Sequence, residues 1–230
     1  MKYSAVIFDL FGTLIDNFSF EEYRRTLVEM ASALSAPPDD FAGLWLDLWE
    51  ERMNGTLESP VGVIEHICRE LSVRPDDTQI EYATRIRFDM NRRAIKVRPD
   101  AVNVLSKLKA EGYKTGLISD CSHEMPAIWD KLPLAPLIDI TAFSCLAGIT
   151  KPDPRIYKLV TEQLGVKPKD CLYVGDGSSQ ELAGAAQLGM TPVLIRVIGD
   201  GDYDNPYRIK SDEWDGLRVS SLSEVLALVR

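Results

Sequence analysis

The chain has 230 residues, and its 26 Lys and Arg against 35 Asp and Glu give a formal net charge of −9 at pH 7. This charge argues against binding to a nucleic-acid backbone, which depends on clustered Lys and Arg. A hydrophobic fraction of 45% and a charged fraction of 27% indicate a folded rather than a disordered protein.

Nothing in the sequence predicts a membrane protein or a secreted one. The longest apolar runs span a few residues, whereas a transmembrane helix needs roughly 20. The run Ala5–Phe8, near the start of the chain, is also too short for a signal-peptide core. The four cysteines form no C-x-x-C pair, which favours free thiols over disulfides or a zinc site. We therefore expect a cytoplasmic protein that contacts neither membrane nor nucleic acid.

The first predicted element is a buried parallel strand over Ala5–Phe8, because this run is apolar on both faces. From about residue 16 to residue 95, apolar residues recur at i, i+3 and i+4, the spacing of amphipathic helices. No strand-like alternation interrupts them, so four helices are expected. Their apolar stripes run over Phe20–Leu34, Phe41–Trp49, Val61–Leu71 and Ile80–Met90.

After Pro99 the predicted helices and strands alternate, which is typical of parallel βαβ units. Helices are expected over Ala101–Ala110, Pro154–Leu164 and Leu182–Leu188, and strands over Thr115–Ile118, Ile138–Phe143, Cys171–Val174 and Pro192–Ile195. An exposed acidic loop, Asp200–Pro206, should precede a last strand and helix. The sequence thus predicts an α/β fold, a parallel sheet flanked by helices, built from residues 1–15 and 97–230. An all-α domain, residues 16–96, is inserted after its first strand.

Polar side chains follow the predicted strands, at the edge where open parallel sheets bind ligands. They are Asp9 and Thr13, Ser119 and Asp120, and Asp176, with Lys151 in a loop before a helix. Each alone has an ordinary explanation as a turn residue, a helix cap or a solvated lysine. Two converging carboxylates repel unless a cation lies between them, which implies a divalent ion such as Mg²⁺. That ion and the lysine would offset the charge of a phosphate group.

Four segments resemble, in order and spacing, the four signature motifs of the haloacid dehalogenase-like (HAD) hydrolase superfamily. They are Ile7–Leu14, Gly116–Ser119, Lys151–Pro154 and Tyr173–Asp176. The helical insertion is similar to the C1 cap of subfamily I, so the resemblance covers essentially the whole chain. It implies the HAD-like Rossmannoid fold and hydrolase activity, and it says little about the substrate.

The resemblance also implies a role for each matching residue. Asp9 would be the nucleophile that forms an aspartyl-phosphate, Ser119 would bind the phosphoryl group, and Lys151 would neutralise charge. Asp176 would hold Mg²⁺ together with Asp9 and the backbone carbonyl of Phe11.

The remaining motif positions would shape the site. Gly12 and Thr13 would form the loop after the nucleophile, and Asp120 is a further candidate for the substrate loop. The helical domain would close over the site and select a small anionic substrate. Relatives of this size occur as monomers and as homodimers, and the sequence does not choose between them.

Two positions depart from the pattern of the family's phosphatases. Phe11 stands where most carry a second Asp, which protonates the leaving group and later activates water. Such acid–base catalysis is typically worth about 10²- to 10⁴-fold. In the fourth motif, Gln180 and Glu181 replace an Asn-Asp or Asp-Asp pair, so Glu181 would contact the metal directly or through water. Asp16, Asp120 and His123 are weak candidates for a substitute acid.

Three functions stay open. A halide leaves without a proton, and family dehalogenases carry an aromatic residue where Phe11 stands and a Lys and Tyr spaced as Lys151 and Tyr157 are. They use no metal, however, and generally lack an acid in the place of Asp176. The phosphonate-cleaving branch lacks the second Asp and keeps Mg²⁺, but it uses a cap lysine that is missing here. The sequence favours a Mg²⁺-dependent phosphatase over a 2-haloacid dehalogenase, with a low-activity or non-catalytic relative as the third alternative.

Charged and aromatic residues of the helical domain permit two readings. Its arginines are candidates for gripping an anionic substrate, namely Arg24, Arg25, Arg52, Arg92 and Arg93. The run from Arg85 through Arg87 to Arg93 is expected to be a solvated helix face. Trp45 and Trp49, at i and i+4, are expected in the core.

Overall fold

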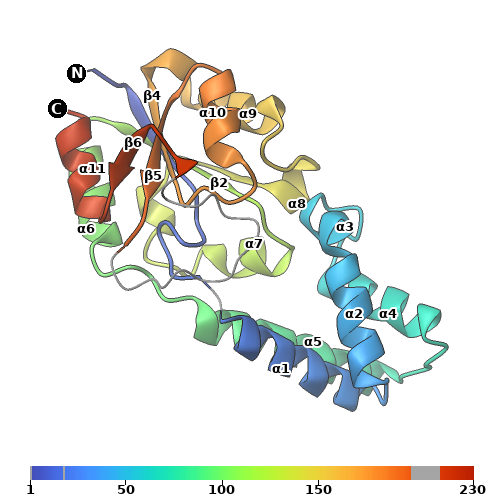
Figure 1. Ribbon diagram of the computed structural model, residues 1–230. Coiled ribbons are helices and arrows are strands. Elements are labelled where there is room, and N and C mark those ends of the chain that lie inside the picture. Colours follow the sequence, from blue (N-terminus) through green and yellow to red (C-terminus); the bar gives the residue numbers. More distant parts are fainter. Residues whose placement is uncertain (1, 18, 198–212) are drawn as a thin grey trace.

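A single parallel sheet forms the centre of the computed structural model, which describes residues 2–17, 19–197 and 213–230 (Figure 1). Its strand order is β3-β2-β1-β4-β5-β6. The strands are β1 (Ala5–Phe8), β2 (Lys114–Ser119), β3 (Ile140–Phe143), β4 (Cys171–Gly175), β5 (Thr191–Ile195) and β6 (Leu217–Val219). The predicted α/β class and its strands are confirmed. β3 starts at Ile140 rather than Ile138 because the Asp139 carboxylate accepts a hydrogen bond from the backbone N–H of Thr115 at 2.8 Å and turns the chain there.

Alternate residues of each strand point to opposite faces of the sheet, so both faces are apolar and helices cover both. Val6 and Phe8 of β1 join one core cluster, and Ala5 and Ile7 join another. The first cluster includes residues of α6 (Ala101–Ala110), α7 (Glu124–Trp129) and α11 (Leu222–Leu228). The second includes residues of α9 (Pro154–Leu164) and α10 (Glu181–Gln187). Short helical turns occur at α8 (Ser144–Ala147), Ala135–Leu137 and Pro168–Asp170.

Five helices between β1 and α6 form what we call the helical insert, which extends away from the sheet (Figure 1). They are α1 (Phe20–Ala33), α2 (Pro38–Asp47), α3 (Trp49–Met53), α4 (Pro60–Glu70) and α5 (Asp77–Ala94). The second of the four predicted helices is thus two, which meet at Leu48. The insert has its own buried apolar cluster, which includes Leu27, Phe41 and Ile64. These residues lie on the predicted stripes.

The helix boundaries follow local sequence signals. The hydroxyl of Ser59 accepts a hydrogen bond from the Gly62 N–H at 3.0 Å, with Pro60 in the first turn of α4. A capping box starts α5, where Asp76 and Gln79 exchange side-chain and backbone hydrogen bonds.

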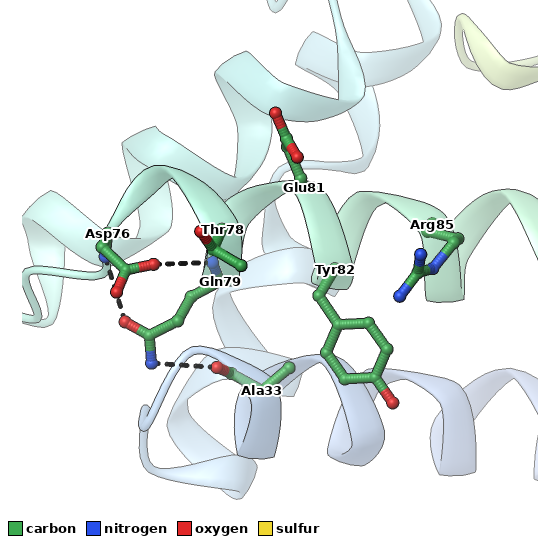
Figure 2. A pocket seen from close by; sticks show the side chains of 7 residues that line it. All are labelled: Ala33, Asp76, Thr78, Gln79, Glu81, Tyr82 and Arg85. Atoms are coloured by element: carbon green, nitrogen blue, oxygen red, sulfur yellow. Dashed lines mark hydrogen bonds between the residues drawn. The ribbon is translucent and has the colours of Figure 1, made fainter.

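A shallow pocket of about 310 Å³ lies at the outer end of the helical insert, where α5 begins beside the end of α1 (Figure 2). Gln79 crosses it and donates from Nε2 to the Ala33 carbonyl at 3.1 Å. None of the predicted site residues lines this pocket.

Three further expectations concern the chain as a whole. All four cysteines are free thiols, as predicted, and all four are also buried. Within the described ranges, no helix is long and apolar enough to cross a membrane. The predicted acidic loop, Asp200–Pro206, lies outside the described residues.

Candidate active site

Three of the predicted site residues meet at the carboxyl edge of the sheet. Because β1 pairs with both β2 and β4, Asp9 after β1 lies between Ser119 at the end of β2 and Asp176 after β4. All three side chains are buried, at 4%, 0% and 0% exposure. Oδ2 of Asp9 and Oγ of Ser119 have no nitrogen or oxygen partner among the described residues. These buried polar atoms are therefore available to a ligand.

Lys151 joins two of the buried carboxylates. Its Nζ donates to Oδ1 of Asp9 at 2.7 Å and to Oε2 of Glu181 at 2.6 Å. The loop that carries it is fixed by Asp120, whose Oδ1 accepts from the Lys151 backbone N–H at 3.0 Å. The alternative that Asp120 caps the next helix is wrong, because α7 has His123 at its N-cap with no side-chain bond. Asp120 thus positions the lysine.

Glu181 is held on both carboxylate oxygens by protein donors. Oε1 accepts from the Gly177 N–H at 2.8 Å, and Oε2 accepts from the Tyr173 hydroxyl at 2.8 Å in addition to Lys151. The longer side chain fits because residue 175 is glycine, since a Cβ there would lie 2.2 Å from Oε1 of Glu181. Glu181 is therefore a buried part of the charge network around Asp9.

The loop after Asp9 is folded tightly against Asp176. Gly12 has a φ of +77°, and a Cβ on it would lie 2.3 Å from Oδ2 of Asp176, so only glycine fits. The buried guanidinium of Arg98 donates from Nε to the Thr13 carbonyl at 2.9 Å and from Nη2 to the Gly12 carbonyl at 2.8 Å. Thr13 is buried, and its Oγ1 has no partner within the described ranges. Phe11 is half-buried against the sheet.

Three carboxylates and one lysine form a buried charge network at this edge. Burial raises the pKa of Asp9 to about 6, although the Lys151 ammonium lowers it in part. Burial, followed by the negative charge of Asp9, raises the pKa of Glu181 to about 8. Burial alone would lower the pKa of Lys151, but Asp9 and Glu181 hold it well above its ordinary value. The ammonium of Lys151 binds Asp9 and Glu181, and a carboxylate oxygen of Asp176 lies within 4.8 Å of theirs. A positive charge near them would favour the ionised carboxylates.

A divalent cation fits this set of donors. Ligand atoms of Asp9, Asp176 and Glu181 all lie within 4.8 Å of one another. Hard ions such as Mg²⁺ prefer carboxylate and carbonyl oxygens. Oδ2 of Asp9 has no protein partner in the described structure, which leaves a buried oxygen for an ion. Both oxygens of Glu181 already accept hydrogen bonds, so Asp9 and Asp176 are the better ligands.

One charged residue of the helical insert contradicts the prediction of a solvated face. Arg87 on α5 is 3% exposed, and its Nε donates to Oε1 of Glu124 on α7 at 2.6 Å. Its guanidinium also stacks on the Tyr23 ring, 4.8 Å from the centroid. Arg87 is therefore a buried link between the insert and the sheet domain.

The two tryptophans predicted to lie in the core differ in burial. Trp45 is fully buried, as expected, whereas Trp49 is 54% exposed, so its placement in the core is wrong. Trp49 is the first residue of α3, after the break at Leu48, and no longer follows the apolar face of α2.

Three supporting residues were missed from the sequence. Arg98 fixes the loop after Asp9, the Tyr173 hydroxyl holds Glu181, and Arg196 donates to the backbone carbonyl of Asp176. Tyr173 gave a signal, because a tyrosine in a fully buried strand needs a partner for its hydroxyl. The arginines gave none, since their partners are distant in the chain.

Comparisons with known proteins identify the family to which the chain belongs. The family model "haloacid dehalogenase-like hydrolase" matches residues 3–189. The chain is 27% identical to a glyceraldehyde 3-phosphate phosphatase of Methanopyrus kandleri, over 98% of this chain and 97% of the relative. It is 28% identical to (S)-2-haloacid dehalogenase 4A of Burkholderia cepacia, over 85% and 84%. The crystal structure of a HAD phosphatase from Thermococcus onnurineus aligns with a TM-score of 0.66 at 21% identity, over 98% and 97%.

Proposed function

Because the chain belongs to the haloacid dehalogenase-like hydrolases, we propose that it is a Mg²⁺-dependent phosphatase of a small anionic phosphate ester. One observation carries the proposal: Asp176 and Glu181 lie buried beside Asp9, with ligand atoms within 4.8 Å of one another. A metal-free dehalogenase would bring the carboxylate of a haloacid toward these extra negative charges. The phosphatase named among the relatives supports the same choice.

Asp9 would be the nucleophile. A carboxylate oxygen of Asp9 would form a bond to phosphorus as the bond to the ester oxygen breaks, which gives an aspartyl-phosphate. Water would then attack this intermediate, release phosphate and restore Asp9. Lys151, 2.7 Å from Oδ1, would offset negative charge on Asp9 and the phosphoryl oxygens. The hydroxyl of Ser119 would donate to a phosphoryl oxygen.

Mg²⁺ would be held by Asp9, Asp176 and the backbone carbonyl of Phe11. When bound, it would neutralise negative charge on the carboxylates and the phosphoryl group. Arg98 would keep the loop of Gly12 and Thr13 in place through its bonds to their carbonyls.

The leaving group would take its proton from water, because Phe11 carries no acid. Of the substitute acids, Asp120 already binds the backbone of Lys151, and Asp16 lies 3.5 Å from Nη1 of Arg98. Each of these two carboxylates therefore already has a protein partner. We expect good turnover of esters with acidic leaving groups and slow turnover of simple alkyl phosphates.

The helical insert, within residues 16–96, would act as a cap that closes over the site and selects the substrate. The core would comprise residues 1–15 and 97–230. We further propose a cytoplasmic enzyme, a monomer or homodimer, with no nucleic-acid or membrane partner. Its four free, buried thiols suit a reducing compartment.

Phosphate release from p-nitrophenyl phosphate tests the proposal, with and without Mg²⁺, for the wild type and for Asp9→Asn. This leaving group needs no acid, so we expect Mg²⁺-dependent turnover in the wild type and none above background in Asp9→Asn. Glyceraldehyde 3-phosphate, the substrate in the name of one relative, is the first metabolite to try. No Mg²⁺-dependent release from either ester would overturn the proposal.

The second candidate is a metal-free 2-haloacid dehalogenase, favoured by Phe11 and by the named relative. The position of Tyr157 weakens it, since this fully buried hydroxyl donates to the Glu181 carbonyl at 3.0 Å. Chloride release from 2-chloropropionate without metal would support this candidate. No activity in either assay would favour the third alternative, a low-activity or non-catalytic relative.

A further inference from the structure

A narrow pocket separates the helical insert from the loop that follows β2. It holds about 180 Å³ of space between atoms, and in this arrangement it has no room for a water molecule. The wall from the insert includes Trp45, Arg52 and Pro60, and the opposite wall includes Ser122 and Glu124. Ligand entry therefore needs the two walls to move apart.

Arg52 on α3 is a buried cation without a carboxylate partner among the described residues. It is 2% exposed, and its guanidinium lies between two tryptophans, 5.0 Å from the Trp45 ring centroid and 5.7 Å from that of Trp49. Nη1 makes a long bond of 3.4 Å to the Tyr23 hydroxyl. Nε and Nη2 are buried and have no partner in the part of the chain described. Burying an unpaired cation is unfavourable unless something else binds it.

The carboxylate in the pocket wall does not supply the missing charge. Glu124 is bound to Nε of Arg87 at 2.6 Å. Burial acts to raise the pKa of Glu124, but Arg87 and the Ser122 hydroxyl lower it more, so the group is ionised and already paired. Glu124 therefore serves Arg87, and Arg52 has no ion pair with a carboxylate among the described residues.

The donors left over on Arg52 have a defined shape. Nε–H and one N–H of Nη2 point in parallel from one edge of the planar guanidinium, a fork that matches two oxygens of a carboxylate or a phosphate. Lysine offers no such fork. Because Arg52 is 2% exposed, a bond between its guanidinium and an anion would form largely away from bulk water, which strengthens it.

The pocket lies close to the reaction centre. Ser122 follows Ser119 by three residues, so their Cα atoms are at most about 11 Å apart. The loop that begins at Ser119 therefore joins the reaction centre to this wall of the pocket.

We propose that the Nε and Nη2 edge of Arg52 binds a second anionic group of the substrate, a carboxylate or a second phosphate, away from the bond that is cleaved. The substrate class is then a small phosphate ester with two anionic ends. This inference rests on the proposed phosphatase function and specifies its substrate.

Three two-carbon phosphates test the inference: carboxymethyl phosphate, ethane-1,2-diyl bisphosphate and 2-hydroxyethyl phosphate. The wild type should prefer one of the two esters with a second anionic end to the hydroxyethyl ester, whose other end is neutral. The preferred ester shows whether Arg52 binds a carboxylate or a phosphate. In Arg52→Gln this preference, as a ratio of kcat/KM values, should fall about 10- to 100-fold, the usual effect of losing a charge-assisted hydrogen bond. The loss should appear mainly in KM. Arg52→Lys should recover only part of it.

Arg92→Gln is the matched control. Arg92 was also a sequence candidate for binding the substrate, but its side chain is 54% exposed and pairs with Asp89 at 2.9 Å. It should leave the substrate preference unchanged. Equal kcat/KM values for the three esters, or an unchanged preference in Arg52→Gln, would overturn the inference about Arg52. Turnover of p-nitrophenyl phosphate in the same preparations would still support the phosphatase.

A binding assay separates the two proposals. Carboxymethyl phosphate should change the tryptophan fluorescence of Asp9→Asn, since Trp45 and Trp49 flank Arg52. The response should weaken about 10- to 100-fold in apparent affinity when Arg52→Gln is added. This response in a protein that hydrolyses no phosphate would keep the anion site and reject the phosphatase. A response that ignores Arg52 would reject the site.

Discussion

Replacing Glu124 by Gln should destabilise the fold more than replacing an exposed charge of the helical insert. Oε1 of Glu124 lies 2.6 Å from Nε of Arg87, and the two side chains are only 3% and 4% exposed. The substitution leaves the Arg87 cation buried without its counter-charge, which typically costs about 3–5 kcal/mol. We expect a loss of this size in the free energy of unfolding.

Urea denaturation at pH 7 measures the effect. The control is Arg92→Gln, whose ion pair with Asp89 is exposed and should contribute less than about 1 kcal/mol. The double variant Arg87→Met with Glu124→Leu should recover most of the loss, because neither charge is then buried. A loss below about 1 kcal/mol in Glu124→Gln, or independent effects in the double variant, would refute this account of the link.

The pH dependence gives the same prediction a sign. Burial would raise the pKa of Glu124, but Arg87 and Ser122 bring it below its ordinary value of 4.5. A carboxyl group with a lowered pKa in the folded state adds stability above its unfolded pKa and loses it as the pH falls through the folded one. The difference in stability between the wild type and Glu124→Gln should therefore be constant above about pH 5 and shrink below pH 4.5.

Two further substitutions probe the buried charge network. Gly12→Ala should reduce Mg²⁺-dependent turnover of p-nitrophenyl phosphate about 100-fold, because its Cβ would lie 2.3 Å from Oδ2 of Asp176. The control is Gly189→Ala, which is also at positive φ but has open space around it and should lose stability without losing activity. Equal activity in the two variants would contradict this reasoning. Glu181→Gln should cost about 1–3 kcal/mol in urea unfolding, since an amide nitrogen would face a protein donor, and should also slow turnover because Lys151 loses one of its anchors. Unchanged stability would show that the three bonds to this carboxylate contribute little.

The sequence could predict those parts of the site that depend on strand ends. A parallel sheet brings the carboxyl ends of neighbouring strands together, so Asp9, Ser119 and Asp176 were predictable once the strands were recognised. The tie between Lys151 and Glu181 was not, because it depends on how α10 packs and on the room above Gly175.

Arg87 shows where local pattern misleads. It stands among other arginines, which suggests a solvated face, yet it shares a stripe with Ala83, Met90 and Ala94, which are buried on the same helix. Its burial depends on Glu124, 37 residues further along the chain. Helical spacing carried the correct signal, and only the partner's position could explain why a charge is tolerated there.

A cluster of carboxylates and the buried cation of Arg52 lie on either side of the loop that follows β2. Asp9, Asp176 and Glu181 cluster near the end of β2, and Arg52 lines the pocket whose other wall includes Ser122 and Glu124. A ligand of opposite charge that binds at either place would stabilise the folded chain. Mg²⁺ would offset the carboxylates. A substrate whose phosphate binds beside Asp9 and whose second anion binds Arg52 would then hold the helical insert against the sheet. Closure of the insert and recognition of the second anion would then be the same event.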